Sequence, residues 1–292
     1  MEIFREIRKK MTSAGIDERE ARAIALLLME KVAGLDSTAA LLAEADKPLV
    51  GKDGSDVRER LSECAAKVAS GIPVQHVLGE ADFMGRTFAV DSNVLIPRPE
   101  TAELVEWALQ LYRMRWGSGQ RRIVDIGTGS GCIALSIAAE EPAAKVEAWD
   151  VSRAALDVAS RNAEALGVEV KMRQVDILKE KVECGNSEPF SMIVSNPPYI
   201  CQSEAADMEA QVLDHEPHLA LFVSDRDPLL FYREIATKGL KLLAPGGILL
   251  FEINRRFGQE TVELLRSLGY KDVELRQDMF GNDRMVKGER GE

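Results

Sequence analysis

Apolar residues near the beginning of the chain recur with the period of a helix. Between Asp17 and Ala33 they return every three or four residues, at positions Ala21, Ile24, Ala25, Leu28 and Val32. This spacing places them on one face, which is typical of an amphipathic helix. Asp17 precedes the pattern and suits the N-cap. We therefore predict a helix that begins after Asp17 and ends near Ala33.

The rest of the first seventy residues is also helical in pattern. Asp36 or Ser37 can cap a short helix, and Ser55-Asp56 can cap another that runs toward Ser70. The stretch Gly71-Ile72-Pro73 then interrupts the pattern, because glycine and proline favour turns. We predict a small helical bundle over residues 1–72, followed by a domain boundary.

After this boundary the pattern becomes one of strands and helices. Residues 83–90 alternate around Gly85-Arg86, which predicts a hairpin, and residues 73–100 are predicted to link the bundle to the next domain. From Thr101 onward, helical patterns alternate with short apolar runs, which predicts an α/β fold with a parallel sheet. The last two runs, 271–276 and 284–288, flank Gly281-Asn282 and predict an antiparallel hairpin at the sheet edge.

A glycine-rich turn follows the predicted strand 123–126. Its sequence is Gly127-Thr128-Gly129-Ser130-Gly131, and Asp125 precedes it. Glycines let the backbone approach a ligand closely. The spacing differs from the G-x-G-x-x-G that holds a pyrophosphate, and an acid at Asp125 suits a cationic amino-acid ligand better than a diphosphate. We interpret residues 127–131 as a cofactor loop; the alternative is a plain strand–helix turn.

Two further acids are placed to complete this cofactor site. The predicted strand 145–150 ends at Asp150, whose carboxylate can accept hydrogen bonds from both hydroxyls of a ribose. Asp150 can alternatively cap the next helix, but Ser152 can take that role instead. A third strand is predicted to end at Val175-Asp176-Ile177, where Asp176 and Ile177 are placed to meet an adenine.

The stretch Asn196-Pro197-Pro198-Tyr199 follows an apolar run, residues 190–195, that predicts a buried strand. The prolines remove two backbone donors and leave carbonyl oxygens free. The Asn196 side-chain oxygen and the Pro197 carbonyl can accept both hydrogens of a planar –NH2 group, and Tyr199 can offer a π face to it. We predict that these four residues grip an amide or an exocyclic amine, against the alternative of a simple turn.

These motifs together resemble the S-adenosylmethionine-dependent methyltransferases. More narrowly, the chain resembles the protein-(glutamine-N5) methyltransferases that modify class-1 peptide-chain release factors. The stretches that carry this likeness are Ile96-Pro97-Arg98-Pro99-Glu100-Thr101, residues 215–222, residues 243–247 and residues 280–286. In one departure, Asn254 and basic residues follow Glu252-Ile253, where the family usually has a glycine.

The resemblance implies a Rossmann-like, seven-stranded methyltransferase domain over residues 101–292, with S-adenosylmethionine as cofactor. It implies transfer of a methyl group to the glutamine of the Gly-Gly-Gln motif in a release factor. Asn196, Pro197, Pro198 and Tyr199 are then the expected catalytic residues, and Asn196 is also expected to contact the amino-acid end of the cofactor. Every chemical motif lies after residue 73, so residues 1–72 are expected to recognise the protein substrate.

Charge argues against a nucleic-acid substrate. Residues 1–70 carry 12 basic and 13 acidic residues, and the remainder carries 25 basic and 35 acidic residues, a net charge of −10. An enzyme that binds nucleic acid is expected to carry a basic surface. An adenine methyltransferase is therefore disfavoured, while a ribosomal-protein glutamine methyltransferase stays open. A third alternative, a cofactor-binding regulatory protein, is disfavoured because a complete transfer site is present.

Other features fit a soluble intracellular enzyme. No apolar run approaches the length of a membrane span, and the four cysteines are dispersed, as in a reduced, cytoplasmic protein. We expect a monomer with no membrane association and no direct nucleic-acid binding. His215 and His218 suggest a metal site, but Pro217 between them spoils a helical ligand face, and we expect none. Arg98 and Glu100 can form an ion pair or contact substrate.

Overall fold

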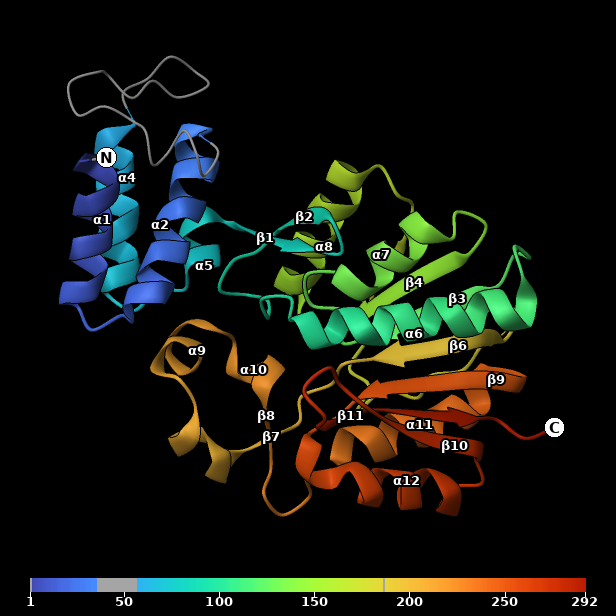
Figure 1. Ribbon diagram of the computed structural model, residues 1–292. Coiled ribbons are helices and arrows are strands. Elements are labelled where there is room, and N and C mark those ends of the chain that lie inside the picture. Colours follow the sequence, from blue (N-terminus) through green and yellow to red (C-terminus); the bar gives the residue numbers. More distant parts are fainter. Residues whose placement is uncertain (1, 36–56, 186) are drawn as a thin grey trace. The chain divides into compact units, whose positions relative to one another are not determined.

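The computed structural model describes residues 2–35, 57–185 and 187–292, and these form two compact units (Figure 1). The first unit comprises Met1–Glu80 and Glu209–His215, and the second comprises Ala81–Met208 and Glu216–Glu292. The predicted linker is therefore divided, since residues 73–80 pack with the first unit and residues 81–100 with the second. The division of labour between the units remains a proposal.

The first unit is helical. Its described helices are α1 (Glu2–Ser13), α2 (Glu18–Ala33), α4 (Arg58–Ala69), α5 (Val74–Leu78) and α9 (Ala210–His215). Apolar side chains of α1, α2 and α4, among them Ile7, Leu28 and Leu61, form one buried core. The predicted N-cap is confirmed, because the Asp17 carboxylate accepts hydrogen bonds from Arg19 N at 2.8 Å and Glu20 N at 3.4 Å.

The helix predicted to run toward Ser70 is confirmed as α4, which ends at Ala69 with Ser70 as its C-cap. The caps proposed at Asp36, Ser37 and Ser55-Asp56 lie outside the described residues. In the first unit, the sequence pattern therefore identified two of the described helices from their apolar faces.

The predicted hairpin is formed by β1 (Glu80–Phe83) and β2 (Arg86–Ala89). Met84 and Gly85 connect the strands, with φ values of 48° and 72°. Positive φ at both positions is the requirement of the two-residue turn that matches strand twist. Asn162 of helix α8 (Arg153–Leu166) holds β2 in place, because its side chain accepts from Ala89 N at 2.7 Å and donates to Ala89 O at 3.0 Å.

A seven-stranded sheet forms the centre of the second unit, in the order β10-β11-β9-β6-β3-β4-β5. The strands β3, β4, β5, β6 and β9 are parallel, and β11 and β10 are antiparallel at the edge, as predicted. Their bounds are β3 (Arg122–Ile126), β4 (Lys145–Asp150), β5 (Lys171–Gln174), β6 (Phe190–Ser195), β9 (Leu243–Glu252), β10 (Lys271–Gln277) and β11 (Asp283–Glu289).

Helices cover both faces of this sheet (Figure 1). Ile123 of β3 faces a core shared with α6 and α7, while its neighbour Val124 faces a core shared with α11 and α12. Successive strand residues point to opposite faces, so a strand that is covered on both sides is apolar throughout. The helices are α6 (Pro99–Trp116), α7 (Cys132–Glu140), α8 (Arg153–Leu166), α11 (Leu230–Leu242) and α12 (Gly258–Ser267).

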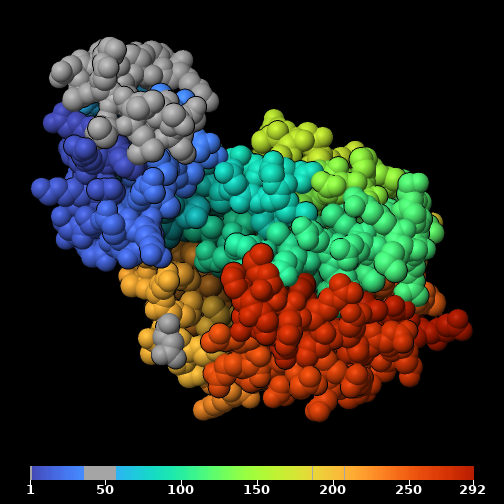
Figure 2. Space-filling view, in the orientation of Figure 1, coloured from blue at the N-terminus to red at the C-terminus, as the bar shows by residue number. Residues whose placement is uncertain are grey.

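Short elements complete the second unit. Strands β7 (Ile200–Cys201) and β8 (Phe222–Val223) pair in parallel. The other short elements are η1 (Gln202–Asp207), helix α10 (His218–Leu221) and η2 (Arg255–Phe257). In Figure 2 the red C-terminal segment borders the green segment that contains α6. Glu103 of α6 accepts a hydrogen bond from Met279 N at 3.2 Å at this border. Across the described residues, no helix has the length and apolarity that a membrane span requires.

Candidate active site

The direction of the sheet order reverses between β3 and β6, and the candidate site lies there. The chain continues from β3 to β4 and β5 on one side, then crosses to β6 on the other. In such sheets, ligands bind outside the carboxyl ends of the strands at the reversal. The Ser195 hydroxyl at the end of β6 donates to Ile126 O at the end of β3 over 2.6 Å, which joins the two strand ends.

A cavity of about 380 Å³ opens at this point. Its lining includes every sequence-predicted site residue except Gly131 and Tyr199, namely Gly127, Thr128, Gly129, Ser130, Asp150, Asp176, Ile177, Asn196, Pro197 and Pro198. The structure thus brings residues 127–130 of the glycine-rich turn, Asp150 and residues 196–198 into one cavity. Side chains that the sequence argument did not assign to the site also line it, including Thr101, Phe231 and Ile235.

Asp125, whose acid we took to suit a cationic ligand better than a diphosphate, is not part of the cavity lining. Its carboxylate is fully buried and accepts from the Thr128 hydroxyl at 2.6 Å and from Ala134 N at 3.3 Å. Burial raises the pKa of Asp125 to about 7, and the hydrogen bond from Thr128 opposes this rise. The residue therefore holds the glycine loop against the first turn of α7.

Gly131 serves packing in the structure. Its φ is +83°, and a β-carbon there would lie 2.9 Å from Leu135 Cδ1 and 3.2 Å from Ala159 Cβ. A side chain would collide with α7 and α8, so glycine is needed for the close approach of loop and helices. Asn162 of α8 adds a second restraint by donating to Ser130 O over 2.9 Å.

Asp150 ends β4 and lines the cavity beside Gly129. Its Oδ2 accepts from Gly129 N at 2.9 Å and its Oδ1 accepts from Ser152 N at 2.8 Å. Ser152 itself caps α8 through Ala155 N, as predicted. Each carboxylate oxygen keeps a further lone pair, so Asp150 can still accept from ligand hydroxyls. Burial raises the pKa of Asp150, while these backbone N–H groups lower it.

The third strand ends earlier than predicted. Strand β5 ends at Gln174, so Asp176 and Ile177 lie in the loop that follows it. The Asp176 carboxylate accepts from Leu178 N and Lys179 N, and its interaction with the Lys179 side chain lowers its pKa. Ile177 and Phe231 give this end of the cavity an apolar lining.

Asn196 follows β6 and is linked by hydrogen bonds to Glu252, the last residue of the neighbouring strand β9. Its Nδ2 donates to the Thr101 hydroxyl at 3.3 Å, and that hydroxyl donates to Glu252 Oε2 at 2.7 Å. The Tyr199 hydroxyl donates to Glu252 Oε1 at 3.1 Å. Tyr199 is thus turned toward Glu252, and its ring does not line the cavity. Burial and the negative charge of Glu252 raise the pKa of Tyr199.

The turn after Glu252 needs no glycine in this chain. Asn254 has a φ of −64°, and its side-chain oxygen accepts from Arg256 N at 3.0 Å as the cap of η2. Its Nδ2 donates to Tyr199 O at 3.0 Å. Asn254 therefore helps to fix the position of the Asn-Pro-Pro-Tyr segment.

Arg98 pairs with Glu216 and not with Glu100, so of the two open alternatives the Arg98–Glu100 ion pair is wrong and a contact with substrate stays a prediction. The Arg98 guanidinium donates to Glu216 Oε1, while Glu216 Oε2 accepts from Ile96 N at 3.1 Å. Glu216 is buried, so it ties residues 96–98 to the segment before α10. The family resemblance singled out residues 96–101 and residues 215–222, but the pairing between them is visible only in the fold.

Neither the histidines nor Cys132 adds a reactive group to the site. His218 packs edge-on against Phe222 with ring centroids 5.3 Å apart. Within residues 2–35, 57–185 and 187–292, no group of three or more His, Cys, Asp or Glu side chains could hold a metal. Burial raises the pKa of the Cys132 thiol to about 12, which opposes any activation by the helix N-terminus.

The fold and this cavity define an S-adenosylmethionine-dependent methyltransferase. Residues 109–219 match the methyltransferase small domain, and a methyltransferase structure from Pyrococcus furiosus shares the fold. That structure is 19% identical, with a TM-score of 0.50 over 72% of this chain and 91% of its own. The residues fit the cofactor: Asp150 can accept from ribose hydroxyls, Ile177 and Phe231 are apolar, and the glycine loop offers close backbone approach.

Sequence comparison identifies the family. Residues 2–79 match the PrmC N-terminal domain. The chain is 42% identical to the release factor glutamine methyltransferase of Bacteroides thetaiotaomicron, over 93% of both chains. It is 48% identical to that of Flavobacterium psychrophilum, over 74% of both chains. The chain therefore belongs to the release factor glutamine methyltransferase family.

Proposed function

We propose that this chain transfers a methyl group from S-adenosylmethionine to the side-chain amide nitrogen of the glutamine in the Gly-Gly-Gln motif of class-1 release factors. One observation carries the proposal: Asn196, Pro197 and Pro198 line the same cavity as Gly129 and Asp150. An amide grip and a cofactor loop therefore share one space. The substrate class is that of the curated relatives, which are release factor glutamine methyltransferases.

An amide nitrogen is a weak nucleophile because its lone pair is delocalised into the carbonyl group. The Asn196 side-chain oxygen and the Pro197 carbonyl oxygen accept its two hydrogens, which fixes the plane of the amide. Positioning of this kind can contribute roughly 7–11 kcal/mol of the barrier for well-oriented reactants. The nitrogen becomes more positive in the transition state, so both acceptors bind it more tightly there than in the ground state.

Bound S-adenosylmethionine supplies an electrophilic methyl group on a sulfonium centre. The chain's own part would be to hold and orient it: Asp150 would accept from the ribose, Asp176 and Ile177 would border the adenine, and residues 127–130 would approach the amino-acid end, as would Asn196. The amide nitrogen needs no base before transfer, because its excess proton can leave from the product. Pro197 and Pro198 present no N–H donors that would compete for the acceptors.

The first unit is proposed to recognise the protein substrate. The described residues that line the cavity all belong to the second unit, and the first unit has a core of its own. A single glutamine in a loop offers little contact area, so a second surface is needed for affinity and specificity. Deletion of residues 1–72 should raise KM for the intact release factor and leave cofactor binding in place. A short Gly-Gly-Gln peptide is the control, since its kcat/KM should not change; an equal effect on both substrates would contradict this role.

Two other substrates remain to be compared with release factors. A ribosomal-protein glutamine offers the same amide, and adenine in nucleic acid offers a similar –NH2 group, although the net charge of −10 after residue 70 disfavours the latter. Incubation with labelled cofactor and equal amounts of release factor, ribosomal proteins and DNA tests the proposal. Label in the release factor alone is the expected result, in keeping with a cytoplasmic, monomeric enzyme of translation. Label in DNA or only in ribosomal protein would contradict it.

A further inference from the structure

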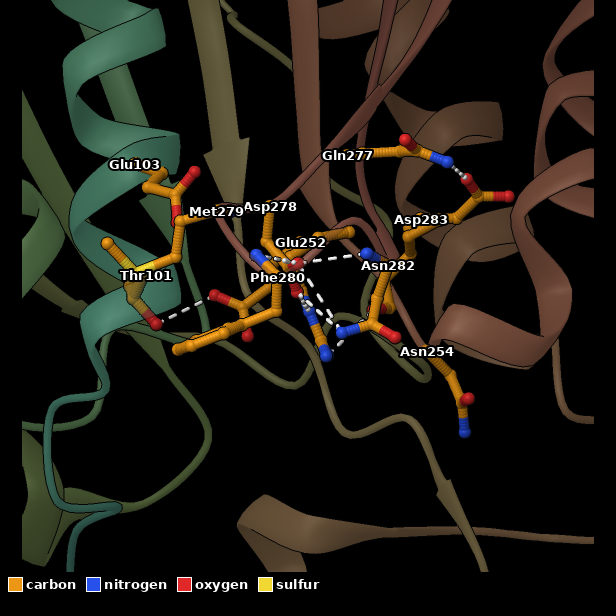
Figure 3. Close-up of polar contacts among 12 residues, drawn as sticks. Thr101, Glu103, Glu252, Asn254, Gln277, Asp278, Met279, Phe280, Asn282 and Asp283 are labelled. Atoms are coloured by element: carbon orange, nitrogen blue, oxygen red, sulfur yellow. Dashed lines mark hydrogen bonds and ion pairs between the residues drawn. The ribbon is translucent and has the colours of Figure 1, made fainter.

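A chain of hydrogen bonds runs from a buried carboxylate to the amide of Asn196. Glu252, at the end of β9, is 1% exposed. Its Oε2 accepts from the Thr101 hydroxyl over 2.7 Å, and Thr101 Oγ1 accepts in turn from Asn196 Nδ2 over 3.3 Å. Figure 3 shows Thr101, on the first turn of α6, directed at the Glu252 carboxylate. The three residues come from three separate segments of the chain.

The direction of every bond in this chain is determined by its first member. An ionised carboxylate can only accept, so the single hydrogen of Thr101 must point to Glu252. The Thr101 oxygen can then only accept from Asn196, which therefore turns its –NH2 group to Thr101. The carbonyl oxygen of Asn196 is left for the cavity. This is the orientation that gripping a substrate –NH2 group requires. In the opposite orientation the –NH2 group of Asn196 would face the –NH2 group of the substrate, and two donors cannot form a hydrogen bond with each other.

We propose that Thr101 and Glu252 are positioning residues that set the orientation of the Asn196 amide. The inference rests on the proposed amide grip and assigns a role to the last residue of the Ile-Pro-Arg-Pro-Glu-Thr block. Neither residue touches the substrate amide in this proposal. Both act through Asn196.

The surroundings of Glu252 hold it as an acceptor. Tyr199 donates its hydroxyl to the second carboxylate oxygen at 3.1 Å, so both oxygens receive hydroxyl donors. Burial raises the pKa of Glu252, while the hydrogen bonds from Thr101 and Tyr199 and the positive charge of Arg284 oppose this rise. Arg284 is itself held by Asp278, which lies in the turn between β10 and β11, at 3.2 Å. The carboxylate is thus supported from β11 as well as from α6.

Two substitutions test the role with little change in shape. Thr101→Val removes the hydroxyl, and Thr101→Ser keeps it. Glu252→Gln replaces an obligate acceptor by a group that can donate, which allows the whole chain to reverse. We expect Thr101→Val and Glu252→Gln to lower kcat about tenfold or more, as for one misdirected hydrogen bond in a transition state. Cofactor affinity should change much less than kcat, and Thr101→Ser should retain most of the rate.

A matched control separates positioning from packing. Thr261 in α12 is also fully buried, and its hydroxyl donates to Phe257 O over 2.7 Å. Thr261→Val should therefore keep the wild-type kcat. Thermal unfolding of every variant identifies those that fold, and Glu252→Gln provides the test independently if Thr101→Val does not.

The decisive experiment is a double-mutant cycle on the full chain with release factor as substrate. Thr101→Val should slow the wild type but cause no further loss in an Asn196→Ala background, because its only route is Asn196. An equal loss in both backgrounds, or no loss in the wild type, would overturn the positioning role while the grip itself stands. If Asn196→Ala alone keeps wild-type turnover, the grip fails, and the positioning role fails with it.

Discussion

The hydroxyl of Thr128 donates a hydrogen bond to the buried carboxylate of Asp125 over 2.6 Å. The other carboxylate oxygen, Oδ1, has no hydrogen-bond partner in the part of the chain that the structure describes. The carboxylate of Asp125, which precedes the glycine loop, thus forms its hydrogen bonds within the protein. It fixes the shape of the loop, and its burial has a measurable consequence.

Asp125 should make stability depend on pH. Its pKa is about 7 in the folded chain against an ordinary value of 3.8, so between these pH values the folded state holds a proton that the unfolded state has lost. The Asp125 contribution to stability is therefore present below pH of about 4 and is lost as pH rises toward about 7. Asp125→Asn cannot lose this proton. Chemical unfolding should show the variant gaining stability relative to wild type between about pH 4 and about pH 7, with little further change above that range. A constant difference would contradict the assignment.

Asp150 should govern cofactor affinity. Asp150→Ala removes two charge-assisted hydrogen bonds to the ribose, each worth roughly 1.5–3 kcal/mol, so the cofactor should bind at least about tenfold more weakly. Asp157→Ala is the matched control, since Asp157 on α8 is exposed and pairs with Arg153 at 3.0 Å. Titration calorimetry measures both. Unchanged affinity of the Asp150 variant would remove this residue from the ribose site.

Gly131 should matter for stability more than a glycine of similar backbone conformation elsewhere. Both Gly131 and Gly167 have positive φ, at +83° and +65°, which costs an L-residue about 1–2 kcal/mol. Only at Gly131 would a β-carbon also meet neighbours, with Leu135 Cδ1 at 2.9 Å. Gly131→Ala should therefore lower Tm clearly more than Gly167→Ala. Equal losses would show that α7 and α8 relax around the added methyl group.

The parts of the structure that were predictable are those set by local patterns. The period of three to four residues gave α2, alternation gave the β1–β2 hairpin, and the buried apolar runs gave β3 and β6. The turn residues Gly281-Asn282 between two strand-like runs gave the edge hairpin. Strand β5 was harder to recognise in the sequence, because it ends at Gln174 and three of its four residues are charged or polar and exposed. Its end was placed too late, since the apolar residues Val175 and Ile177 belong to the following loop.

The pairings around the site were not predictable, because they join residues far apart in sequence. Arg98 pairs with Glu216 across 118 positions, whereas the sequence argument considered only the nearby Glu100. Thr101 and Glu252 are separated by 151 positions. Motifs pointed to residues that line one cavity, as with Asp150 and Asn196, but only the fold shows which carboxylate faces which donor.

Asn196→Ala should separate chemistry from cofactor binding. The substitution removes one acceptor for the amide hydrogens and leaves the glycine loop and Asp150 intact. Methyl transfer should fall by about 10²-fold or more, as for the loss of one oxyanion-hole contact, while cofactor affinity changes much less. The rate of methyl transfer by the full chain is measured in samples that are quenched at timed intervals.

Mass spectrometry of the release factor after this reaction tests the central claim most directly. The wild-type enzyme should add one methyl group to the side-chain amide of the Gly-Gly-Gln glutamine, and Asn196→Ala should add it far more slowly. A release factor in which that glutamine is replaced by Glu should stay unmodified, because a carboxylate has no hydrogens for Asn196 and Pro197 to accept. Methylation at any other residue, or wild-type turnover by Asn196→Ala, would contradict the account.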